Sequence, residues 1–203
     1  MKFQPYDILS TILPGYIFYA FLIKLFPQSQ FEFDVLPSIA IAYLIGYILN
    51  TISSLIEPLY FLLWGGKPSS NLLLGKGINK VKFTEWMQTK HLLLEDYQGV
   101  INSEKKESLD ALFNVASRKA NTAKNPRIAD FNATYALARA ILTCVIAISP
   151  FIIFVFWKNH KLWLIVIALL SIIFLVGLRA RQRGYYFSRE VLNTYLVEST
   201  KQQ

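Results

Sequence analysis

Residues 161–178 read KLWLIVIALLSIIFLVGL, and Lys161 is the only charged residue among them. A helix needs about 20 apolar residues, each adding about 1.5 Å, to cross about 30 Å of hydrocarbon. The stretch is continuously apolar and shows no alternation with a period of two, which favours a helix over a strand of a membrane barrel. It therefore predicts a membrane-spanning helix.

Three further apolar runs lead outward from this stretch. Residues 136–157 precede it, separated only by a hairpin-length turn, and residues 8–26 and 36–64 are the other two. Of the 203 residues, 54% are hydrophobic, and the mean hydropathy of +0.36 is high for a soluble domain. Residues 8–26 lack the features of a signal peptide, so we count them as a span. The sequence predicts an all-α integral membrane protein with four transmembrane helices.

Basic residues predict how these spans are oriented. Most of the 21 lysines and arginines lie in residues 65–134, in the tail from Arg179 or at Lys2. Cytoplasmic loops of membrane proteins carry an excess of lysine and arginine. We therefore expect both termini and residues 65–134 to lie in the cytoplasm. The net charge of +8 suits contact with anionic lipid headgroups, and binding of nucleic acid stays open as an alternative.

The spans divide the chain into four predicted segments. Residues 1–64 hold transmembrane helices one and two, and residues 65–134 form a cytoplasmic helical insert. Residues 135–179 hold transmembrane helices three and four, and residues 180–203 form a cytoplasmic amphipathic tail. The insert is too small for a large core of its own, so we expect its apolar faces to pack on each other, on the membrane surface or on a neighbouring subunit.

Two helices are predicted within the insert. The first covers residues 84–98, with Thr84 as its N-cap, and the second covers residues 103–123. Asn125-Pro126 should end the second helix. Its apolar residues recur at helical spacing on one face, at Leu109, Leu112, Phe113 and Ala116.

The tail is expected to be helical after Gly184. Its apolar stripe, formed by Tyr185, Leu192, Tyr195 and Leu196, fits either an interfacial helix on the inner leaflet or a partner for the insert. The aromatic residues at its start favour headgroup contact for Tyr185 and Tyr186. The candidate contacts to membrane surface or partner are Arg179, Arg181, Arg183, Tyr185 and Arg189.

Span two is longer than the hydrocarbon requires. As one straight helix, residues 36–64 would extend about 43 Å, so this run either tilts or bends at Pro58 into an interfacial segment ending at Trp64. In either case Glu57 lies near the cytoplasmic boundary. We expect it to lie at the depth of Arg139 in span three and to pair with it, with Asp7 nearby.

A polar stripe leads along span two to Glu57. Its members are Gly46, Asn50, Ser53 or Ser54, and Glu57, at steps of three and four. Such a stripe faces other helices or water, because facing lipid is costly. It either packs and staples a bundle through a Glu57–Arg139 pair, or lines a pore or proton path within one chain or between subunits.

Chemistry-bearing motifs find little support in the sequence. The only histidines, His91 and His160, have no metal-ligand spacing around them, and the single Cys144 lies in an apolar run. The segment GGKPSSNLLLGKG lacks the pattern of a phosphate-binding loop. We therefore expect no catalytic residue, no cofactor and no metal site.

The order of features resembles small four-span membrane proteins of bacterial defence loci. It is most similar to the accessory protein beside the RNA-guided nuclease of type VI-B CRISPR systems. The resemblance rests on Pro14-Gly15 in span one, Gly46-Tyr47 with Asn50, Ser53 and Glu57 in span two, the helical insert, and Arg179-x-Arg181-x-Arg183 followed by Tyr185, Arg189-Glu190-Val191 and Tyr195. It covers most of the chain in layout, and no motif in it is diagnostic.

This resemblance implies a protein of bacterial antiphage defence that modulates, or is triggered by, a cytoplasmic nuclease complex. Without a catalytic motif, we expect it to be a non-enzymatic accessory or effector of the bacterial inner membrane. Its partners would be the lipid bilayer and an RNA-guided nuclease or another defence protein, and it would act as a homo-oligomer, including as a pore. The HEPN type of accessory has an arginine four to six residues before a histidine, and neither histidine here has one. The alternative is a small channel or transporter subunit that uses the stripe on span two; without an internal repeat it would have to oligomerise.

Overall fold

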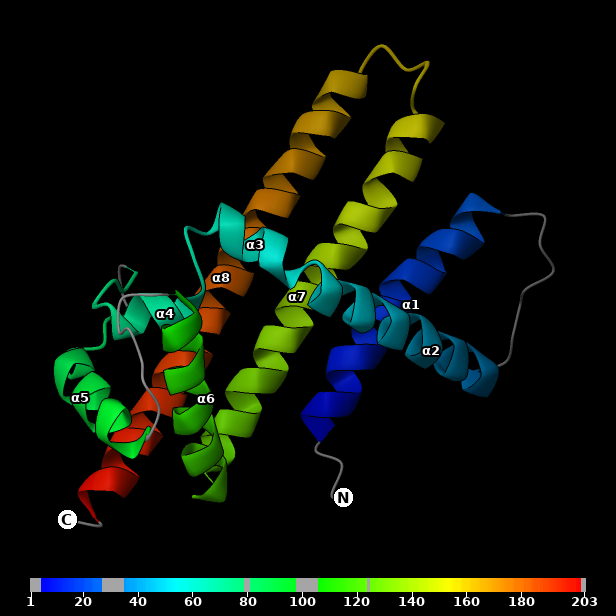
Figure 1. The fold of residues 1–203 in the computed structure, drawn as a ribbon. Coiled ribbons are helices and arrows are strands. Elements are labelled where there is room, and N and C mark those ends of the chain that lie inside the picture. Colours follow the sequence, from blue (N-terminus) through cyan, green and yellow to red (C-terminus); the bar gives the residue numbers. More distant parts are fainter. Residues whose placement is uncertain (1–4, 27–34, 79–80, 98–105, 124, 202–203) are drawn as a thin grey trace. The chain divides into compact units, whose positions relative to one another are not determined.

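The computed structural model describes residues 5–26, 35–78, 81–97, 106–123 and 125–201, drawn in Figure 1 as coloured ribbons. Within these ranges the chain is 85% helical and contains no strand, only a single bridge between Ile78 and Val81. The expected all-α fold is confirmed. The helices are α1 (Pro5–Leu25), α2 (Val35–Leu55), α3 (Glu57–Leu63), α4 (Pro68–Leu73), α5 (Trp86–Asp96), α6 (Lys106–Thr122), α7 (Pro126–Val155) and α8 (Leu162–Thr200).

Three of these helices are long and apolar enough to cross a membrane. They are α2, α7 and α8, and a fourth apolar stretch in α1, Ser10–Leu25, is shorter. A membrane-embedded helical protein is therefore supported, with three helices of spanning length in the described part of the chain.

The chain divides into two compact units. The first unit comprises Met1–Glu57 and Ala133–Ala180, and the second comprises Pro58–Asn132 and Arg181–Gln203. Helices α7 and α8 each contribute residues to both units.

In the first unit, α1 and α2 cross with their backbones almost in contact (Figure 1). A Cβ atom added at Gly15 would lie 1.8 Å from the carbonyl oxygen of Ala42. One added at Gly46 would lie 1.8 Å from the carbonyl oxygen of Thr11. Glycine is thus required at both positions, as is common where membrane helices pack closely.

Helix α7 joins this pair through a small apolar core. Leu49 of α2 and two residues of α7, Cys144 and Ile148, are buried together. The Cys144 thiol donates to the carbonyl oxygen of Pro14 at 3.5 Å, and the rings of Phe21 and Phe151 meet edge to face. Cys144 therefore packs as a small apolar residue in the first unit.

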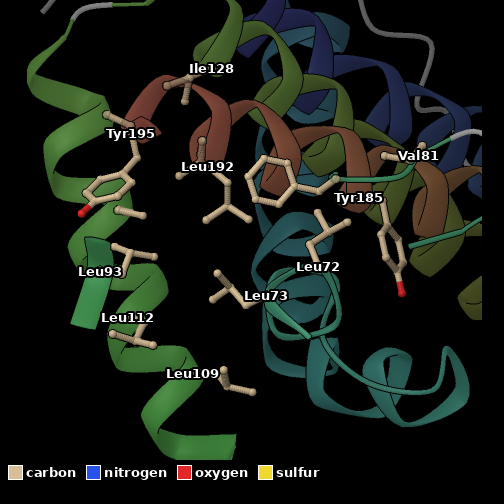
Figure 2. Packing of buried hydrophobic residues seen from close by; sticks show 14 residues of the cluster. Leu72, Leu73, Val81, Leu93, Leu109, Leu112, Ile128, Tyr185, Leu192 and Tyr195 are labelled. Atoms are coloured by element: carbon tan, nitrogen blue, oxygen red, sulfur yellow. The ribbon is translucent and has the colours of Figure 1, made fainter. Parts of the chain in front are cut away.

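The second unit has a conventional apolar core, shown in Figure 2. Side chains from α4, α5, α6, the start of α7 and the end of α8 contribute to it. Its largest fully buried members are Leu72, Leu73, Leu93, Leu109, Leu112, Tyr185, Leu192 and Tyr195. The insert and the tail thus form one core together. Of the two alternatives predicted for the tail, the structure shows the one in which it packs against the insert.

Several predicted helix boundaries differ from the observed ones. Thr84 is not the N-cap of α5: Glu85 holds that position, without a side-chain cap. Helix α8 runs through Gly184 without a break, so the tail continues the predicted fourth span. The predicted end at Asn125-Pro126 is confirmed, because α6 ends at Thr122 and α7 begins at Pro126, a favoured residue for a first helical turn.

Candidate functional site

The candidate site lies where α2 ends. The helix stops at Leu55, Ile56 forms a turn, and α3 begins at Glu57. Pro58 at the second position of α3 fits the start of a helix but not the interior of one, since it lacks a backbone N–H. The long apolar run is therefore interrupted at Ile56 and does not form one uninterrupted helix. As the first residue of α3, Glu57 is also placed where a negative charge stabilises a helix.

Glu57 accepts contacts from two residues of α7. The guanidinium of Arg139 lies with Nη1 2.5 Å from Oε1 of Glu57. The hydroxyl of Tyr135 donates to the same oxygen at 2.6 Å. The Arg139 side chain is only 10% exposed and that of Glu57 is 25% exposed. The two charges thus neutralise each other in a largely buried setting.

Further contacts orient Arg139. Its Nη2 donates to the Ser54 hydroxyl at 3.5 Å, and its guanidinium carbon lies 4.6 Å from the centre of the Tyr135 ring. At that distance the ring contributes a cation–π attraction. Within the described residues its Nε is buried without a hydrogen-bond partner. We call Ser54, Glu57, Tyr135 and Arg139 the α3–α7 cluster.

The α3–α7 cluster joins two segments far apart in the sequence. A buried arginine without its carboxylate would be strongly destabilising, so each partner requires the other. The geometry is that of a staple between α7 and the turn that follows α2. It provides an ion pair and a phenol hydrogen bond, and both are directed at other protein groups.

The structure divides the predicted polar stripe of α2. Gly46 packs against α1, whereas Ser54 and Glu57 contact Arg139. Ser53 is fully buried, with its hydroxyl unpaired in the described part of the chain, and Asn50 is half-buried. Gly46 and the Ser54–Glu57 end of the stripe thus contact different helices. The side chain of Asp7 lies outside the described residues.

The predicted surface contacts of the tail are also divided. Arg179 is exposed, whereas Arg181 and Arg183 are half-buried. Tyr185 is 1% exposed and accepts a hydrogen bond from the Asn71 amide at 2.7 Å. The prediction that Tyr185 contacts lipid headgroups is wrong, because its ring lies in the core of the second unit.

Two arginines of the tail lie beside aromatic rings. The guanidinium carbon of Arg181 lies 6.0 Å from the Tyr185 ring, and that of Arg189 lies 5.2 Å from the Tyr186 ring. The Tyr186 ring also stacks on Phe131. These two arginines thus pack on the second unit's own aromatic residues.

Three polar contacts were not predicted from the sequence, namely those made by Tyr135, by Asp110 and by Tyr195. Tyr135 precedes Arg139 by four residues, a spacing that places both on one helix face and could have indicated it. In the second unit Asp110 pairs with Lys67 and accepts from the Ser70 hydroxyl at 3.2 Å. No local signal indicates that contact, since forty residues or more separate its partners.

Another polar group lies beside the core of the second unit. The Tyr195 hydroxyl donates to Asp96 at 2.6 Å, and Lys119 lies 3.3 Å from the same carboxylate. Burial raises the pKa of Tyr195, and the hydrogen bond to Asp96 adds to this effect. Tyr195 therefore stays a neutral donor in the folded protein.

Among the described residues, no group of three or more His, Cys, Asp or Glu side chains could hold a metal ion. Comparison with protein-family models, with curated proteins and with solved structures gave no match to this chain.

Proposed function

We propose that this chain is a non-enzymatic accessory protein of the bacterial inner membrane, with four spans and both termini in the cytoplasm. In this proposal the second unit binds a cytoplasmic partner through its surface. The observation that carries the proposal is the shared core of the second unit, in which the insert and the C-terminal tail bury Leu112, Tyr185 and Leu192 together. A connection between two spans needs no such core, so a folded unit of this kind is better explained by a binding role.

Some exposed basic residues of the second unit support an acidic partner, although exposed carboxylates such as Glu85 and Asp130 lie in the same unit. Lys76, Lys82, Arg118 and Arg127 are all exposed, and no ion pair engages Arg118 or Arg127 among the described residues. Unpaired surface lysines and arginines attract acidic protein surfaces and nucleic-acid phosphates over a distance of about 10 Å at moderate salt. The resemblance to type VI-B accessory proteins makes an RNA-guided nuclease complex the partner to test first.

The continuity of two helices suggests how binding could reach the membrane. Helices α7 and α8 each contribute residues to both units without a break. A partner that changes the second unit would act on helices that also include the candidate spans. In the described part of the chain, Gly46 of the α2 stripe packs on α1, and Ser54 and Glu57 engage Arg139, so three of its members already contact protein.

Purification in mild detergent from cells carrying the neighbouring genes tests this proposal. Native mass spectrometry would give the mass of the particle and the identity of what co-purifies. We expect a soluble protein or an RNA–protein complex in the particle. A closed ring of several copies without a soluble partner would contradict the proposal and favour a pore.

A matched pair of charge-reversal variants then locates the binding surface. The test variant carries Arg118→Glu and Arg127→Glu in the second unit. The control carries Lys158→Glu and Lys161→Glu, two exposed residues at the turn between α7 and α8. Both variants change the net charge equally, so loss of the partner from the test variant alone supports the second unit as the binding surface. Equal loss or equal retention in both would contradict it.

The defence role is tested in cells. Overexpression of the chain with its neighbouring genes is compared with and without phage challenge. Slower growth or protection that depends on phage supports a role in defence. An effect of equal size without phage would contradict a conditional effector.

A further inference from the structure

Helix α3 carries an apolar face that the chain itself leaves open. Leu59, Leu62 and Leu63 are 60%, 78% and 81% exposed. On its other side, Tyr60 and Trp64 are buried, with their rings stacked 5.8 Å apart. The helix thus has one face against the protein and one row of leucines facing outward.

The length of α2 indicates at which depth this row begins. Its 21 residues, at about 1.5 Å each, rise about 31 Å, which matches about 30 Å of hydrocarbon. Only Ile56 separates the end of α2 from the start of α3. If α2 crosses the membrane along its length, α3 begins where the hydrocarbon ends.

Two local features define the start and the end of α3. At its start, Glu57 is paired with Arg139 and Tyr135 of α7. At its end, Gly65 and Gly66 have φ angles of 78° and 115°, a backbone conformation that other residues rarely adopt and that is common where a helix ends. The ion pair therefore positions the start of the helix, and the two glycines end it.

We infer that α3 is an interfacial anchor whose Leu59, Leu62 and Leu63 insert into the boundary between lipid headgroups and acyl chains. The occupant of this face is the lipid surface itself. α3 has seven residues and no basic residue, so its affinity for the membrane surface would come from the apolar area of these leucines.

This inference depends on the chain being embedded in a membrane but not on the partner proposed above. A second copy of the chain is the other occupant that could cover three exposed leucines. The two occupants differ in a measurable way, because only lipid brings acyl chains into contact with position 62.

Site-specific fluorescence in vesicles tests the inference. The full chain with Cys144→Ala serves as a background without cysteine, accepted once it gives a single symmetrical peak in detergent. Leu62→Cys is the test position. Met87→Cys, exposed on α5 of the second unit, is the water control, and Leu170→Cys, in the apolar part of α8, is the deep control. Each is labelled with an environment-sensitive dye in phosphatidylcholine and phosphatidylglycerol vesicles whose acyl chains carry a quencher either near the glycerol or near the chain end.

The expected pattern distinguishes all three positions. The label at position 62 should shift to shorter wavelength and lose most of its emission to the shallow quencher. The label at 170 should lose more to the deep quencher, and the label at 87 should lose little to either. A water-like label at 62 would overturn the inference, and deep quenching there would show a continuous span instead. A label at 62 that is shielded from water but is quenched neither by the shallow nor by the deep quencher would overturn it in favour of a second protein copy.

Discussion

The two units of this chain differ in the contacts that stabilise each of them internally. In the first unit, helices meet through backbone contact at Gly15 and Gly46, through one largely buried ion pair and through only a small apolar core around Cys144. In the second unit, leucine and tyrosine side chains fill a core, as in a water-soluble domain. The difference follows from the solvent: lipid is as apolar as leucine, so burying leucine there stabilises little, and close packing and polar contacts take over.

Breaking the ion pair should have the largest effect. Glu57→Gln leaves the largely buried Arg139 without a counter-charge, which costs about 3–5 kcal/mol when one partner of a buried pair is removed. We expect little folded protein, measured as the monodisperse fraction in detergent.

The double variant Glu57→Gln with Arg139→Gln is the control for that prediction. It removes both charges, so we expect more folded protein than with Glu57→Gln alone. If Glu57→Gln instead accumulates normally and changes ion permeability in vesicles, the polar-lining interpretation replaces the staple.

The glycine crossing should come next. Gly46→Ala places a Cβ 1.8 Å from the Thr11 carbonyl oxygen, and backbone cannot move aside as a side chain can. Overpacking costs about 1–3 kcal/mol, and we expect about 3 kcal/mol or more here. The midpoint of thermal unfolding in detergent measures this loss.

Gly177→Ala is the matched control, because a Cβ at Gly177 meets nothing within 4 Å. Replacing glycine by alanine inside a helix stabilises by up to about 1 kcal/mol. We therefore expect opposite signs for the two variants. Equal effects would mean that α1 and α2 do not cross at Gly46.

The core of the second unit should be sensitive in its own region. Leu112 is fully buried, and Leu112→Ala should cost about 3 kcal/mol through lost transfer energy and a cavity. Hydrogen exchange should rise in α4, α5 and α6 while the amides of α2 stay protected. An equal rise in α2 would argue against two separately packed units.

The smallest effect is expected at the polar edge of that core. Tyr195→Phe removes the hydrogen bond to the partly exposed Asp96, for a loss of about 1 kcal/mol at neutral pH. The raised pKa of Tyr195 means that its stabilising contribution is complete below about pH 10 and declines as the unfolded chain loses the proton first. The unfolding midpoints of wild type and variant should therefore converge above that pH; a constant gap would contradict the assignment.

Much of the helical organisation was predictable from local sequence. The helix interruption before Pro58 and the helix start at Pro126 follow from proline's missing N–H, which acts within one turn. The Glu57–Arg139 contact was expected because both polar residues needed a partner away from lipid. Tyr135 was missed, since tyrosine is common both in cores and at membrane surfaces.

The sequence by itself determined where apolar runs form helices and where proline and glycine interrupt them, because these effects act between close neighbours in the chain. Only the tertiary structure decided what each helix face meets. Tyr185 had an apolar ring and a hydroxyl that suit either headgroups or a core, and it lies in the core because Leu72 and Asn71, more than a hundred residues earlier, complete its surroundings. The choice between two suitable environments is made by residues distant in sequence, so no local pattern contains it.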